Sequence, residues 1–163
     1  MLIDAFWLLS GAVSAAGVLS GQAANGAGNV LSTNTVDLAP LTLGGNQAGD
    51  LGAGERLGIA FSVLTAPTVG TSVRFQMIQA DDAALTTNVQ VIGQTDDIPI
   101  ASLPAGTLVP LHVDAAAPYA PKRYVGARYV NTGAIATLSV VAALVKDMQA
   151  AKNIFFKSGF AVA

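Results

Sequence analysis

The chain of 163 residues contains no cysteine and a single histidine, His112. Without cysteine there are no disulfides, no thiolate metal ligands and no thiol nucleophile. A lone histidine cannot supply a histidine-based zinc site, and it leaves a Ser/His/Asp triad with no spare base. These absences favour a protein without catalytic, metal-binding or cofactor-binding residues.

Charge is also scarce, because charged residues make up 11% of the chain and hydrophobic residues 52%. Few groups are left to keep a free surface hydrated, which favours a surface covered by neighbouring molecules. The other interpretation is a monomer with a surface rich in Gly, Ala and Thr. Residues 1–121 carry two basic and nine acidic side chains, whereas residues 122–163 carry six basic and one acidic. This polarity indicates contacts between copies or with an acidic partner. No nucleic-acid-binding motif surrounds the sparse basic residues, so we expect no nucleic-acid partner.

The first nine residues are apolar but carry no Lys or Arg, which argues against a signal peptide, and they are too few to span a membrane. Sixteen of the twenty residues from 10 to 29 are Gly, Ala, Ser or Asn. This composition predicts a linker, so residues 1–31 are expected to form an N-terminal arm with Phe6 and Trp7 at its tip. A disordered terminus is the competing interpretation.

From Ser32 onward, apolar residues alternate with other residues at a period of two. This pattern predicts strands with one apolar face, separated by Gly, Pro, Asn and Asp turn signals. No long amphipathic helix interrupts them. We therefore expect an all-β fold: a single jelly-roll β-sandwich of about eight antiparallel strands over residues 32–147. The strands are expected at 33–38, 57–64, 73–78, 86–92, 98–103, 109–114, 124–129 and 138–145.

The expected core consists of the apolar residues on one face of these strands. They are Leu57, Ile59, Phe61, Val73, Phe75, Val125, Tyr129, Leu138, Val140 and Leu144. The last strand is apolar on both faces, so it lies either centrally under a cover or against another subunit.

Two pairs of adjacent carboxylates, Asp81-Asp82 and Asp96-Asp97, stand beside turns. Neighbouring residues of an extended chain face opposite ways, so neither pair is expected to form a catalytic dyad. Aspartates at such positions cap backbone amides of turns. A loop calcium site is the alternative, although the spacing differs from that of a dedicated calcium loop. His112 alternates with apolar neighbours and is expected to face solvent or an interface.

Two groups of residues are candidate protein-interface residues. Tyr124 and Arg128 share one strand face on either side of Gly126, with Arg123 beside them. Gly in mid-strand permits close approach of another chain, and Tyr and Arg are enriched at interfaces. The alternative is a solvated face on which the arginines pair with Asp114 or Asp147.

The second group lies in the C-terminal segment, residues 148–163, which is expected to form an arm. It carries Phe155, Phe156 and Phe160, which are too apolar for a free tail. With Phe6 and Trp7 they predict that both chain ends dock on a partner protein or on neighbouring copies. The alternative is that both ends fold back on their own domain.

Five pieces of the sequence resemble, in order, the jelly-roll capsid cement (decoration) proteins of short-tailed phages. They are Ser32–Leu38, Gly52–Leu57, Ile98–Gly106, Lys122–Val130 and Ala136–Asp147. The resemblance implies a single domain bound as oligomers on the outer capsid surface, on a shell built from a different protein, and it implies no catalysis. Its expected partners are the major capsid protein and other copies of itself, as dimers or trimers. Segments 10–29 and 39–50 look longer than the start of such proteins.

The expected location is therefore the virion, after synthesis in the host cytoplasm, with no membrane partner. Two other classes of protein remain. A carbohydrate-binding β-sandwich of a phage fibre or secreted protein would need exposed aromatics, yet the chain has one Trp and three Tyr. A small hydrolase would need a base beyond His112 and scattered carboxylates.

Overall fold

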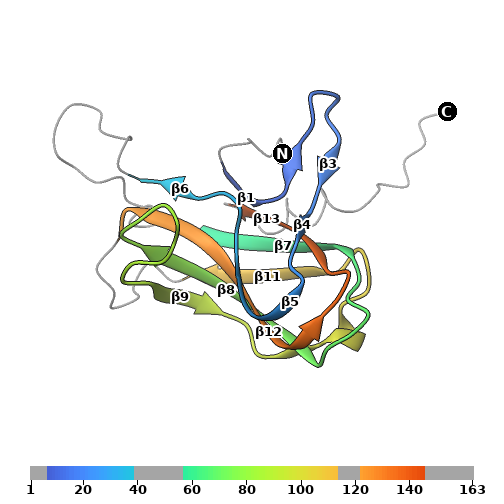
Figure 1. Ribbon diagram of the computed structural model, residues 1–163. Coiled ribbons are helices and arrows are strands. Elements are labelled where there is room, and N and C mark those ends of the chain that lie inside the picture. Colours follow the sequence, from blue (N-terminus) through green and yellow to red (C-terminus); the bar gives the residue numbers. More distant parts are fainter. Residues whose placement is uncertain (1–6, 39–56, 114–121, 146–163) are drawn as a thin grey trace, which may run out of the picture.

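The computed structural model describes residues 7–38, 57–113 and 122–145. These residues form antiparallel strands and one short 3₁₀ turn, as the alternating pattern predicts (Figure 1). The strands are β1 (Leu8–Ser10), β2 (Ala12–Val13), β3 (Leu19–Ser20), β4 (Gln22–Ala23), β5 (Gly26–Leu31), β6 (Val36–Asp37), β7 (Leu57–Thr65), β8 (Ser72–Ala80), β9 (Gln90–Gln94), β10 (Ile98–Pro99), β11 (Leu108–Val113), β12 (Tyr124–Ile135) and β13 (Ser139–Val145), and the 3₁₀ turn η3 is Ile100–Ser102.

Two sheets form the body of the protein. One has the order β1-β13-β7-β11, with β4 also paired to β13, and the other has the order β10-β8-β12-β5, with β6 on β12 and β9 on β8. Taking β1, β5, β7, β8, β9, β11, β12 and β13 as strands one to eight, the sheets read 1-8-3-6 and 2-7-4-5. This exchange of strands between two sheets is the jelly roll, so the predicted fold class is confirmed.

The core between the sheets contains the described residues that the alternation predicts, together with further buried residues such as Val63, Met77 and Leu103. Phe61, Phe75 and Tyr129 meet at its centre, with ring centroids 5.0–5.9 Å apart. Ile59, Val73, Val125, Leu138, Val140 and Leu144 are buried around them. The core prediction is therefore confirmed, except for Leu57, whose side chain lies outside the described residues.

The N-terminal segment is not the linker that its composition predicted, and this prediction was wrong. β1 pairs with β13, and β5 pairs along β12 from Leu31 to Gly26. Leu9 and Ala24 are fully buried in the core. Backbone hydrogen bonds to these partner strands hold the segment, so small side chains do not prevent it from being ordered. The sandwich therefore begins at residue 8, and not at residue 32.

Three predicted strands also differ from the structure. Residues 86–89 belong to a loop, and β9 starts only at Gln90, because Leu85 and Asn88 adopt positive φ angles that extended chain does not allow. In the predicted strand 98–103, pairing ends at Pro99, which is followed by η3. The predicted strand 33–38 is reduced to β6.

The last strand, β13, is covered on both faces by the protein itself. Val140, Ala142 and Leu144 face the core. On the opposite face Val141 and Ala143 are fully buried and pack with Leu8, and Leu19 of β3 lies against them. The sequence left two alternatives for this strand, a cover from its own chain or contact with another subunit. For Val141 and Ala143 the cover comes from the protein's own chain.

Candidate interaction surface

The predicted interface residues of β12 lie on the outer face of its sheet. Val125 and Ala127 point into the core, so Tyr124, Gly126 and Arg128 point outward, as predicted. Strand β8 runs antiparallel beside them, with Ile78 opposite Gly126 and Gln76 opposite Arg128.

Gly126 is covered by its own chain, which contradicts the prediction that it admits another chain. A Cβ atom at Gly126 would collide with Cδ1 of Leu85 and would stand 2.9 Å from Oγ of Ser32. Ser32 Oγ accepts a hydrogen bond from the Ala127 amide at 3.0 Å, and it donates one to the Asn34 carbonyl at 2.9 Å. The missing side chain therefore makes room for Leu85, a residue that sequence reasoning did not single out.

Leu85 stands in the loop 81–89, which covers this end of the sheet. It is 2% exposed although φ is +57°, a conformation that is rare for a bulky residue. It packs with Ile78 and Ala80 of β8, and Tyr124 lies against this group together with other partly buried residues. Tyr124 is thus half-buried against its own chain.

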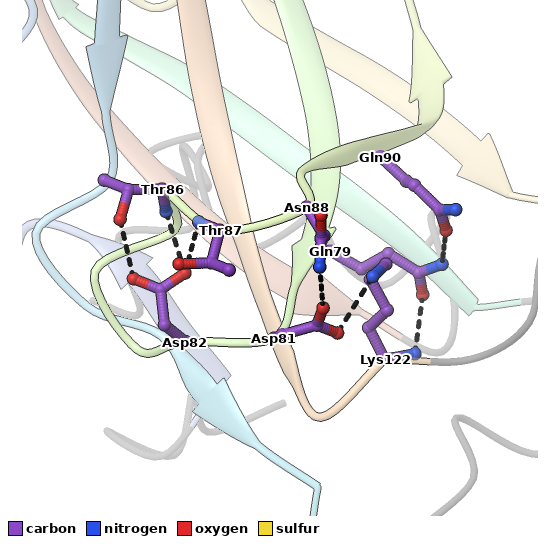
Figure 2. Close-up of polar contacts among 8 residues, drawn as sticks. All are labelled: Gln79, Asp81, Asp82, Thr86, Thr87, Asn88, Gln90 and Lys122. Atoms are coloured by element: carbon purple, nitrogen blue, oxygen red, sulfur yellow. Dashed lines mark hydrogen bonds and ion pairs between the residues drawn. The ribbon is translucent and has the colours of Figure 1, made fainter.

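Asp82 closes the loop, as Figure 2 shows. Its Oδ1 accepts hydrogen bonds from the amides of Thr86 at 3.0 Å and Thr87 at 2.6 Å, and its Oδ2 accepts one from the Thr86 hydroxyl at 2.8 Å. These hydrogen bonds lower the pKa of Asp82, with the Thr87 amide contributing most. The prediction that this carboxylate caps a turn is confirmed.

Asp81 joins the loop to the start of β12. Its carboxylate accepts hydrogen bonds from Lys122 Nζ at 2.8 Å and Asn88 Nδ2 at 2.7 Å, and these bonds lower its pKa (Figure 2). Gln79 accepts a hydrogen bond from the Lys122 amide at 3.2 Å and donates one to Gln90 at 2.8 Å. The two aspartates therefore hold a loop in place through separate sets of bonds.

The arginines of this face have partners within the chain. Arg123 makes a two-pronged salt bridge to Asp37, with both N–O distances 2.9 Å, and its guanidinium lies 4.9 Å from the ring centre of Tyr124. The hydrogen bonds that Arg123 donates to the Asp37 carboxylate raise the pKa of Arg123. Arg128 Nε donates to Gln76 at 2.6 Å, and Gln76 donates to Gln94 at 2.7 Å. The predicted alternative partners, Asp114 and Asp147, lie outside the described residues.

The remaining candidates, Asp97 and His112, stand on other parts of the chain. Asp97 forms a salt bridge with Arg74 at 2.8 Å, and His112 is exposed on β11. Within residues 7–38, 57–113 and 122–145 no three His, Asp or Glu side chains come together as a metal site would require. In the same ranges no helix is long and apolar enough to cross a bilayer.

Of the five aromatic residues predicted to dock, only Trp7 is described, and it is 40% exposed. Phe6, Phe155, Phe156 and Phe160 lie outside the described residues, so the docking of the chain ends stays a prediction.

The N-terminal segment contains a surface that the sequence reasoning missed. β2 and β3 form a hairpin whose tip extends away from the sandwich (Figure 1). Residues 12–18 are all exposed, including Val13 at 46% and Val18 at 64%. The sequence carried a signal for it, because no charged residue occurs between Asp4 and Asp37. The Gly, Ala, Ser and Asn content of the same segment favoured the linker interpretation.

Fold and surface together define a jelly-roll protein whose polar clusters hold its own loops in place. Residues 18–145 match the Bbp16 family model. Because the match spans most of the chain, this protein belongs to the Bbp16 family. The matched segment starts after β1 and β2. No curated protein matches the chain.

Proposed function

We propose that this protein is a non-enzymatic cement protein that binds the outer surface of a phage capsid and stabilises contacts between subunits of the major capsid protein. One observation carries the proposal. The sequence pieces that resemble cement proteins coincide with strands of a single jelly roll. Of the four that fall on described residues, Ser32–Leu38 contains β6, Ile98–Gly106 contains β10 and η3, Lys122–Val130 contains the first part of β12, and Ala136–Asp147 contains β13.

The chemistry of the polar residues supports a structural role. Asp81, Asp82 and Asp97, the carboxylates that would serve a hydrolase, make hydrogen bonds to neighbours in the same chain. The Tyr129 hydroxyl donates to Ser10 Oγ at 2.7 Å deep in the core, where no substrate reaches it. These hydrogen bonds stabilise the loops and the core, which is consistent with a protein that acts through its surface.

Other copies of the chain are proposed as further partners, as dimers or trimers on the shell. Support comes from the low charged fraction of 11% and from exposed apolar side chains such as Trp7 and Leu64.

The proposal is tested on particles of the parent phage. The protein should co-purify with intact particles in near-stoichiometric amount to the shell protein. Particles assembled without the protein should release their contents at a lower temperature than complete particles. Adding the purified protein should raise this temperature again.

Particles that lack the protein and are equally stable would contradict the proposal. Binding to a panel of glycans, in place of shells, would support the alternative of a carbohydrate-binding module.

A further inference from the structure

We propose that the hairpin formed by β2 and β3 is the docking element of this protein, and that its tip inserts into a neutral, apolar recess of the shell protein. This inference rests on the proposed function and names the element and the chemistry of the contact. It concerns residues 12–20, which the family match and the expected interface residues do not single out.

The hairpin presents apolar side chains on a well-defined turn. The Ser14 amide donates to the Val18 carbonyl, and the Gly17 amide donates to the Ser14 carbonyl, both at 2.9 Å. Gly17 has a φ of +74°, and the Val18 amide donates to Ser14 Oγ at 3.1 Å. A three-residue loop ending in a left-handed glycine is a common hairpin connection. Val13 and Val18 are therefore held at a tip with fixed backbone geometry.

The base of the hairpin is fixed to the sandwich. Gly11 has a φ of +104°, and a Cβ atom there would be 2.5 Å from the Ser20 carbonyl oxygen. Asn34 Nδ2 donates to the carbonyls of Leu8 and Gly11, both at 3.2 Å. Leu19 packs against the outer face of β13. Since the element is already ordered, docking does not cost the entropy of ordering a free arm.

The charge distribution identifies the chemistry of the partner. No charged residue lies between Asp4 and Asp37, whereas the ion pairs of Arg74, Lys122 and Arg123 lie on the sheet of β8 and β12 and its loops. A charged partner surface would be desolvated against this hairpin without any opposite charge, which is costly. A neutral apolar recess has no such cost.

The size of the hairpin favours the shell over a second copy. A stable pair of proteins buries about 1,200–2,000 Å² in total, and two tips of a few Ala, Val and Gly residues meeting each other offer far less. In a recess the same valines are surrounded on several sides. If copies that contact one another each bind the same shell, the overall binding is stronger than that of a single hairpin.

The test compares two valines of similar exposure. Val18→Asp places a charge at the tip, and Val69→Asp places the same charge at a valine that is 56% exposed between β7 and β8. Binding to shells of the parent phage that lack this protein is measured by co-sedimentation. We expect Val18→Asp to raise the Kd at least about tenfold, because the charge is buried unpaired. Val69→Asp should leave the Kd within about twofold, as expected for an exposed site outside the contact.

Three further measurements make the outcome decisive. Val18→Thr, which keeps the shape of the side chain, should weaken binding less than Val18→Asp, and melting temperatures of all variants should match the wild type. Wild-type binding should change less than about threefold between about 0.05 and 0.5 M salt, because salt screens only charged contacts.

Val18→Asp binding as tightly as wild type would overturn the inference. So would a change of oligomeric state in Val18→Asp, seen by analytical ultracentrifugation, that leaves shell binding intact. If the wild-type protein itself does not bind shells, the proposed function fails, and the inference fails with it.

Discussion

At the scale of single residues, Gly126 illustrates how a small residue serves packing within the chain. Its lack of a side chain had suggested an approach by another protein, yet Leu85 occupies the space. The positive φ of Leu85 is an unfavourable backbone conformation that burial of the side chain offsets. Glycine and leucine form a complementary pair between β12 and the loop 81–89.

We predict that Gly126→Ala destabilises the protein by about 1–3 kcal/mol, because the added methyl group overpacks a filled site. Urea unfolding measures the change. The double variant Gly126→Ala with Leu85→Ala should lose less stability than the sum of the two single variants. Additive effects would show that the methyl group and Leu85 do not compete for space.

Tyr129 is the second residue whose environment gives a measurable consequence. Burial raises its pKa above the ordinary value of about 10. Above that pH the unfolded chain loses the phenolic proton while the folded chain keeps it, so the folded state binds more protons and stability falls as pH rises.

We therefore predict that the free energy of unfolding decreases above about pH 10, and that the decrease is smaller in Tyr129→Phe. At neutral pH, Tyr129→Phe should cost about 1–3 kcal/mol because Ser10 Oγ loses its partner. Adding Ser10→Ala should recover part of this loss. Denaturant unfolding at a series of pH values checks both statements, and an identical alkaline slope in Tyr129→Phe would contradict the first.

At the scale of elements, the loop 81–89 depends on two ionised carboxylates. The pKa values of Asp81 and Asp82 are lowered in the folded protein by hydrogen bonds. Their contribution to stability is present above the ordinary carboxylate pKa of about 4, and it is lost as pH falls through the lower folded values. Acid should therefore loosen this loop before it affects the core.

We predict that the amides of Thr86 and Thr87 lose protection from hydrogen exchange below about pH 4, whereas amides of β8 do not. Asp82→Ala should remove this protection at neutral pH. Asp96→Ala is the matched control, because it removes the same charge from an exposed position. Equal protection in Asp82→Ala and wild type would show that the carboxylate is not what orders the loop.

At the scale of the whole molecule, the N-terminal segment is part of the jelly roll. β1 and β4 lie beside β13 in one sheet, and β5 lies at the edge of the other sheet. The segment also carries the hairpin, so structural and proposed docking roles occupy the same stretch of chain.

Deletion of residues 1–24 should consequently abolish cooperative folding, or lower the melting temperature strongly, because it removes Leu9 and Ala24 from the core and exposes an edge of β13. Deletion of residues 1–6 serves as the control. Differential scanning calorimetry provides the measurement. A 1–24 deletion that melts like the wild type would restore the interpretation of this segment as a dispensable arm.

The alternation of apolar residues from Leu57 onward determined the all-β class, the core and the facing of β7, β8, β12 and β13, because side chains of a strand alternate strictly between its faces. The turn role of Asp82 also followed from sequence, since capping is local chemistry.

Only the tertiary structure decided the position of the N-terminal segment, because its strands are held by backbone hydrogen bonds to β12 and β13, which composition does not encode. It also decided that Leu85 fills the space at Gly126, a contact between residues 41 positions apart that requires a loop with left-handed residues to fold over the sheet. Local patterns determine which way a side chain faces, whereas long-range packing determines what it meets there.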